Sequence, residues 1–350
     1  CPPVKAERDC RPQCESWPNT RAPRACNACV SRASPGTRRS SCPISMRGMT
    51  RPLGCTPMFS VTIKPKPPAA VHRAALWRCL LEGVRRADPP AAAELARHAG
   101  CSNLVSWAHL FYDAQRDIAL DEPGIERLLA LPGPEERDLR EAVSLRRRLL
   151  RALYLLSDRF PPLFDLVGEP EMRVAIADTR RYFANQDGVA VAVRHLVADA
   201  LLEAWRDQRR VLLVGHSLGS VIAFDVLWEL SHRFAEPGRV DLFLSIGSPL
   251  GLRFVRSQLL GAREQGRRRY PGNIRRWLNL AAIGEMTALD RPMATTWGEM
   301  RGLGLVEAID DRLDLQTYFR GPEGLNLHKC YGYLANAVVG ASIAGWWREG

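Results

Sequence analysis

The sequence has very little lysine, and its positive charge is unevenly spread. Lysine occurs only at positions 5, 64, 66 and 329, so arginine supplies almost all of the net charge of +11. The first sixty residues hold ten basic and three acidic side chains, which account for +7 of that total. The arginine runs 146–148 and 267–269 lie on or between amphipathic helical patterns without interleaved aromatics, as on a solvated face. We therefore expect no nucleic-acid partner.

Cysteines and long apolar runs are also scarce over most of the chain. Seven of the ten cysteines precede residue 56, and only Cys79, Cys101 and Cys330 follow, which is typical of a cytoplasmic protein with free thiols. No apolar run reaches the roughly eighteen residues of a membrane span, and no apolar core of a signal peptide is seen. Residues 333–347 predict a buried final helix, with a membrane-surface anchor as the lesser alternative. Peripheral membrane contact stays open.

Residues 1–59 lack any helical or strand periodicity. They are rich in Arg, Pro, Ser and Cys, which predicts a disordered segment. The spacings Cys10 to Cys14 and Cys26 to Cys29 would suit a zinc ribbon, but no surrounding apolar pattern could form its core, so we expect no metal. The same composition is typical of out-of-frame reading of GC-rich DNA, so a mistranslated segment is the other interpretation.

Residues 60–350 predict one α/β domain. Short runs of β-forming residues alternate with helical patterns, which indicates a mostly parallel sheet with helices on both faces. We expect strands at 60–63, 103–112, 211–214, 240–246, 277–282 and 306–309. Residues 118–168 are predicted to be helical, clearest at 136–156, and form either a cap over an active site or connecting helices, of which the second is favoured.

The segment Gly215-His216-Ser217-Leu218-Gly219 lies between the buried strand at 211–214 and a helical pattern at 220–230. This is the arrangement of a nucleophile elbow, in which a sharp strand-to-helix turn exposes a serine hydroxyl. Glycines two positions to either side avoid collision with neighbouring backbone. The amide of Leu218 at the helix N-terminus could donate to an oxyanion. The alternative is a turn whose serine only caps the helix.

A nucleophilic serine needs a histidine base and an acid that orients it. Downstream of Ser217 there are two histidines, and His232 would lie at the far end of the elbow helix. His328 lies in a loop-like stretch before the last helix, where the base should be. His216 is interpreted as packing or pocket lining because its side chain points elsewhere.

The acid should follow the strand at 277–282. Glu285 is the first choice because it comes three residues after that strand, and Asp290 is the second. Asp310 and Asp311 are more remote candidates. For each of these, a solvated carboxylate or a helix cap is the competing interpretation.

Four segments together resemble the α/β-hydrolase superfamily, in particular its lipase- and esterase-like bacterial members of unassigned substrate. These segments are VLLVGHSLGSVIAFDVL (211–227), LFLSIGSPLGL (242–252), WLNLAAIGEMTALD (277–290) and NLHKCYGYL (326–334). The resemblance implies an α/β-hydrolase fold, a Ser-acid-His triad without metal or organic cofactor, and hydrolysis of an ester through an acyl-enzyme. It matches Ser217 to the nucleophile and His328 to the base. Glu285 stands where such proteins often have Asp after Gly.

One departure from that pattern lies upstream of residue 65. Similar proteins carry a His-Gly turn after an early strand, and the corresponding stretch 59–68 has none. Because composition and motif both break there, we hypothesise that the reading frame or start is wrong upstream of residue 65. If the sequence is right, the loss of one oxyanion donor could weaken activity about 10²- to 10³-fold.

We therefore expect a serine hydrolase that cleaves small-molecule or lipid esters, with thioesters also open. The alternative is a catalytically impaired protein of the same fold that binds a ligand or partner.

Overall fold

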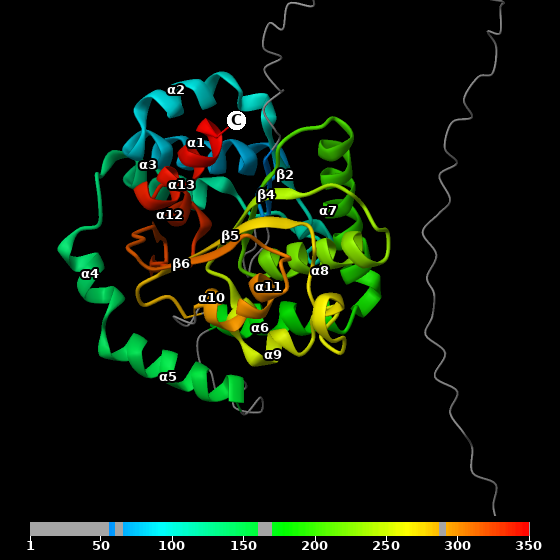
Figure 1. Cartoon of the computed structure of the whole chain (residues 1–350). Coiled ribbons are helices and arrows are strands. Elements are labelled where there is room, and N and C mark those ends of the chain that lie inside the picture. The colour runs from blue at the N-terminus through cyan, green and yellow to red at the C-terminus, as the bar shows by residue number, and fades with distance from the viewer. Residues whose placement is uncertain (1–55, 60–65, 160–169, 287–291, 350) are drawn as a thin grey trace, which may run out of the picture. The chain divides into compact units, whose positions relative to one another are not determined.

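The computed structural model describes residues 56–59, 66–159, 170–286 and 292–349, all of which belong to the unit Thr50–Gly350 (Figure 1). The zinc-ribbon and reading-frame interpretations concern the first 65 residues, which, apart from residues 56–59, lie outside this range. The described part has an α/β architecture built on a parallel sheet, as the alternating pattern predicted.

Six parallel strands form the main sheet in the order β2-β1-β3-β4-β5-β6. Their bounds are β1 Thr56–Phe59, β2 Ser102–Val105, β3 Leu212–His216, β4 Val240–Ile246, β5 Ile274–Ala282 and β6 Ala308–Leu315. β3 and β4 are buried almost throughout, which explains why they are continuous apolar runs and not alternating ones. A small antiparallel pair, β7 Arg320–Gly321 and β8 Gly324–Leu325, follows β6.

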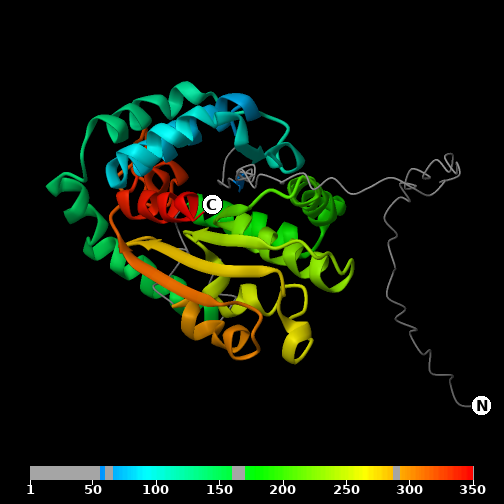
Figure 2. The same ribbon diagram turned by 45° about the horizontal axis from the view of Figure 1, so that its top comes forward.

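Helices cover both faces of the sheet (Figure 2). One face carries α1 Ala69–Ala87, α2 Pro89–Arg97, α12 Cys330–Leu334 and α13 Ala337–Arg348, and α3 Glu122–Ala130 packs against α1. The other face carries α7 Val189–Arg206, α8 Leu218–His232, α10 Met293–Thr296 and α11 Gly298–Gly302. The remaining helices are α4 Glu136–Ala142, α5 Leu145–Arg159, α6 Pro170–Phe183 and α9 Arg253–Arg256.

The final helix, predicted over residues 333–347, begins only at Ala337 as α13, because α12 ends at Leu334, and one side of it is buried as expected. α13 crosses α1 where two glycines face each other: a Cβ on Gly340 would lie 1.9 Å from the carbonyl oxygen of Gly83. Trp346 and Trp347 are 2% and 5% exposed, so the apolar side of this helix is covered by protein and the surface-anchor alternative is not supported. None of the described helices is both long and apolar enough to cross a membrane.

The first strand of the sheet begins earlier than predicted. The backbone of Thr56–Phe59, assigned above to the N-terminal segment, pairs with β2 on one side and β3 on the other. Four residues that include a proline are too few to show a periodicity, so only the pairing reveals the strand. The predicted strand at 60–63 lies outside the described residues.

The region 118–168 is mostly helical where it is described, with a non-helical stretch at 131–135, and its longest predicted helix is broken. The helix predicted over 136–156 is divided into α4 and α5, which part at Val143 and Ser144. α5 is amphipathic, yet four of its six leucines are exposed, and Leu145 and Leu149 are 71% and 62% exposed.

Candidate active site

Ser217 occupies the sharp turn between β3 and α8. Its backbone has φ 53° and ψ −128°, a strained conformation for a residue with a side chain. A Cβ on Gly215 would lie 2.6 Å from the Cα of Ser220, so the turn can close only with glycine at that position. Both features are those of the strand–turn–helix geometry expected from the sequence.

A second serine holds this turn closed from inside. The hydroxyl of Ser220 donates to the carbonyl oxygen of Ser217 at 2.5 Å and lies 2.7 Å from the hydroxyl of Ser248, which follows β4. The amide of Ser217 donates to the carbonyl oxygen of Ile246 at 3.1 Å. The strained residue is therefore fixed by buried contacts to the neighbouring strand.

His328 lies against the serine hydroxyl. Its Nε2 is 2.9 Å from Ser217 Oγ, and its side chain is 18% exposed. The loop around it is held by the side-chain oxygen of Asn326, which accepts the amide of His328 at 3.1 Å. His232 lies at the last residue of α8 and bonds the carbonyl oxygen of Tyr270 instead. Of the two downstream histidines, the structure thus brings only His328 to the serine.

Glu285 completes a continuous chain of contacts. Its Oε1 is 2.8 Å from His328 Nδ1, and its side chain is 1% exposed. A carboxylate can only accept, so Nδ1 carries the proton and Nε2 is left to accept from the Ser217 hydroxyl. Asp290, the second choice from the sequence, lies outside the described residues.

The other two predicted carboxylates do not meet the histidine. Asp310 is exposed on β6. Asp311 accepts the amides of Met293 and Ala294 at 2.8 and 2.9 Å and so caps the start of α10. Its role is the helix cap weighed above as the competing interpretation.

His216 holds the loop of His328 in place through a hydrogen bond to its backbone. Its Nε2–H donates to the backbone carbonyl of His328 at 2.7 Å, and the two rings lie 4.7 Å apart. Burial, with His328 and Lys66 nearby, lowers the pKa of His216 well below its usual range, so this ring is neutral. The sequence predicted packing or pocket lining for this residue, not this hydrogen bond.

Gly247 makes room for the imidazole at the end of β4. Its φ is +52°, and a Cβ there would lie 3.0 Å from His328 Nδ1. Tyr333 supports the same place from α12, since its hydroxyl accepts the amide of Ala282 at 3.0 Å. Neither role was predicted from the sequence, in which a glycine directly after a buried strand was the available signal for Gly247.

The amide of Leu218 is the first of α8 and has no acceptor within the helix. It lies at the positive end of the helix dipole, which suits it to an oxyanion. The segment that would carry a second donor follows β1 and lies outside the described residues. Just beyond it, burial and the nearby Lys329 lower the pKa of Lys66 to about 7.

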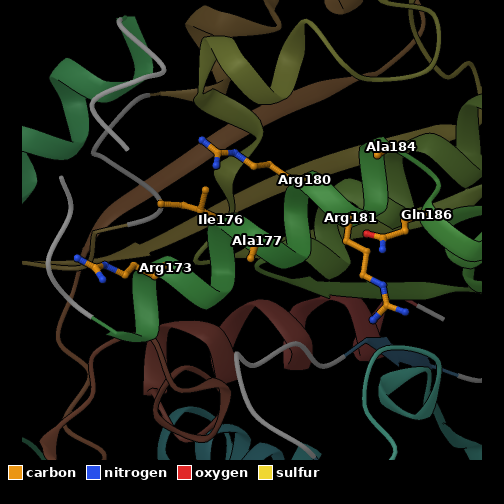
Figure 3. Close-up of a pocket in the computed structure, with 7 residues that line it drawn as sticks. All are labelled: Arg173, Ile176, Ala177, Arg180, Arg181, Ala184 and Gln186. Atoms are coloured by element: carbon orange, nitrogen blue, oxygen red, sulfur yellow. The ribbon is translucent and has the colours of Figure 1, made fainter. Parts of the chain in front are cut away.

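A separate pocket of about 590 Å³ lies along α6 (Figure 3). Arg180 and Arg181 extend to opposite sides of the helix, and Arg181 donates to the carbonyl oxygen of Phe111 at 2.9 Å. The lining residues are Arg173, Ile176, Ala177, Arg180, Arg181, Ala184 and Gln186. None of them belongs to the serine, histidine and glutamate cluster.

Within the described residues, no group of three or more His, Cys, Asp or Glu side chains is placed to hold a metal ion. Comparison with family models, with curated proteins and with solved structures gave no match.

Proposed function

We propose that this protein is a serine hydrolase of the α/β-hydrolase type, which cleaves carboxylic esters through an acyl-enzyme. The observation that carries the proposal is the unbroken chain from Ser217 Oγ to His328 Nε2 at 2.9 Å and from His328 Nδ1 to Glu285 Oε1 at 2.8 Å. Serine at a strained turn, a base within hydrogen-bond reach and a buried acid behind it together form an activated nucleophile.

In the proposed reaction, Ser217 Oγ attacks the ester carbonyl carbon while His328 Nε2 takes the hydroxyl proton. The charge that develops on the carbonyl oxygen is stabilised by the amide of Leu218. His328 then returns the proton to the leaving alcohol as the carbon–oxygen bond breaks. Water, deprotonated by His328, attacks the acyl-serine, and its proton passes back to Ser217. Glu285 stays ionised throughout and stabilises the imidazolium.

We propose esters of small molecules or lipids, including thioesters, as the substrate class, because Ser217 Oγ would attack the carbonyl carbon of each in the same way. The fold by itself does not choose among acyl groups.

The second candidate function is a protein of the same type that binds a ligand with little turnover. Ser217 is only 6% exposed, so little of its surface is open to a substrate. A missing second oxyanion donor would also reduce turnover about 10²- to 10³-fold while leaving binding intact.

Labelling with a fluorophosphonate probe, followed by peptide mapping, tests the proposal. We expect an adduct on Ser217 that is lost in Ser217→Ala and falls by orders of magnitude in His328→Ala. His109→Ala is the matched control. His109 is exposed, follows β2 in the chain, and has no hydrogen bond to any of the three residues. Absence of labelling in the folded wild-type protein would favour the binding function, and labelling at another serine would refute the assignment.

A further inference from the structure

The helix α5 exposes a stripe of leucines to solvent, unlike an ordinary surface helix. At about 100° per residue, positions 145, 149, 152 and 156 fall within an arc of roughly 60°. The three leucines of this arc, Leu145, Leu149 and Leu156, are 71%, 62% and 54% exposed, although an ordinary surface helix turns its apolar stripe to the core.

The buried residues of α5 all carry polar groups and lie on its inner side. Tyr154, Ser157 and Asp158 are 5%, 0% and 4% exposed. Asp158 accepts the amide of Phe254 at 3.0 Å, and Arg147 donates to the carbonyl oxygen of Leu325 at 2.8 Å. These contacts anchor the helix with its leucines outward, so their exposure is a property of the packed structure.

Arginines border the outward leucines. Arg148 and Arg159 are exposed on one side of the arc, and Arg146 is exposed on the other. Asp158, the one acidic residue of α5, is buried, so no negative charge lies among its exposed positions. We call this surface the α5 outer face, formed by Leu145, Arg146, Arg148, Leu149, Ala152, Leu155, Leu156 and Arg159.

We propose that the α5 outer face docks the protein on an anionic lipid surface. A helix with an apolar stripe bordered by arginines lies in the plane of a membrane interface, its leucines at the acyl boundary and its guanidinium groups among the headgroups. Charge complementarity chooses this occupant over a second copy of the chain, because two such faces would bring like charges together. Docking does not require the proposed hydrolysis.

The contacts on the inner side of α5 indicate which side of the molecule would face the membrane. α4, just before it, packs its Ala142 carbonyl against Gly284, beside Glu285. Burial raises the pKa of Tyr154 on the inner side of α5, and the charge of Glu285 adds to this shift. A membrane bound to the outer face would therefore lie on the side of the molecule where the loop of Glu285 is found.

Flotation of the full chain with vesicles tests the proposal. One set of vesicles contains phosphatidylcholine alone, and the other contains about 30% phosphatidylserine, whose negative charge gives the membrane a negative surface potential. We expect binding to the anionic vesicles that weakens at high salt. Leu149→Ser/Leu156→Ser and Arg148→Glu/Arg159→Glu should each lower the partition coefficient at least about tenfold.

Matched variants on other helices serve as controls. Val71→Ser/Val338→Ser removes two valines that are 41% and 42% exposed, and Arg97→Glu/Arg301→Glu makes the same change of net charge at exposed positions. Both should bind almost as wild type. Because every variant keeps the basic N-terminal residues, binding through those residues would be the same in the α5 variants and in their controls. Ser217→Ala should bind as wild type, so failure of docking and failure of the hydrolase proposal are separable.

Three outcomes would overturn the proposal. The first is equal binding of the α5 variants and their controls. The second is equal wild-type binding to neutral and anionic vesicles. The third is no vesicle binding together with a concentration-dependent dimer that Leu149→Ser/Leu156→Ser abolishes, which would make the α5 outer face an interface between copies.

Discussion

Gly284 joins the stability of the domain to the position of the proposed acid. It has φ +78°, and a Cβ there would lie 2.1 Å from the carbonyl oxygen of Ala142 at the end of α4. In Gly284→Ala, the two backbones must part by about 1 Å to restore an ordinary contact. The adjacent Glu285, held 2.8 Å from His328, must shift with the loop.

Two costs add in this variant. A left-handed alanine costs about 1–2 kcal/mol, and overpacking against backbone costs a further 1–3 kcal/mol. We expect a loss of about 2–5 kcal/mol in the free energy of unfolding, measured by urea denaturation. A misplacement of about 1 Å at a catalytic group can cost about 10²-fold in rate, so probe labelling of Ser217 in the folded protein should slow by about that factor.

Gly304→Ala separates the two costs. Gly304 has φ +65°, and no atom lies within 4 Å of the place its Cβ would take. It should therefore lose only the conformational part, about 1–2 kcal/mol, and should label at the wild-type rate. Equal destabilisation by the two variants would refute the packing argument. Extra destabilisation of Gly284→Ala with unchanged labelling would refute the role of Glu285.

Three further predictions concern carboxyl groups. Glu285→Gln should slow labelling of Ser217 by about 10³- to 10⁴-fold, because an amide neither stabilises the imidazolium nor fixes its tautomer, whereas Glu299→Gln should label normally. Asp311→Ala should cost about 1–2 kcal/mol in urea denaturation through its lost helix cap, with no change in labelling rate; slower labelling would reopen the choice of acid. Burial raises the pKa of Asp225 to about 7, so the folded chain keeps a proton that the unfolded chain loses above about pH 4. The free energy of unfolding should therefore fall by about 1.4 kcal/mol per pH unit from pH 5 to 7 because of this group, and Asp225→Asn should remove that slope; an unchanged slope would contradict it.

The sequence predicted the elements that are determined by residues close together in the chain. The run 211–214 is a strand followed by a sharp turn because β-forming residues meet two glycines, and β3 and α8 lie there. His328 followed from chain order alone, and the structure places it 2.9 Å from Ser217. The tetrapeptide Thr56–Phe59 could not be predicted, because its strand depends on partners far along the chain.

Other features depend on contacts that periodicity does not contain. The pattern at 136–156 predicts an amphipathic helix but not which side faces the protein, and Asp158 and Arg147 decide this through bonds to distant backbone. The bond from His216 to the carbonyl of His328 likewise joins residues 112 positions apart. The helix cap formed by Asp311 likewise depends on the position of α10.

Parallel topology explains why three distant residues can meet at all. Ser217 directly follows β3, Glu285 comes three residues after β5, and His328 follows the strand β6 and its hairpin. The carboxyl ends of parallel strands share one edge of the sheet, which is where α/β proteins bind ligands. β4 lies between β3 and β5, and its terminal Gly247 leaves the space that the imidazole fills. A larger residue at 247 would displace His328 from both partners at once, so the geometry of the cluster depends on this strand as much as on the three residues themselves.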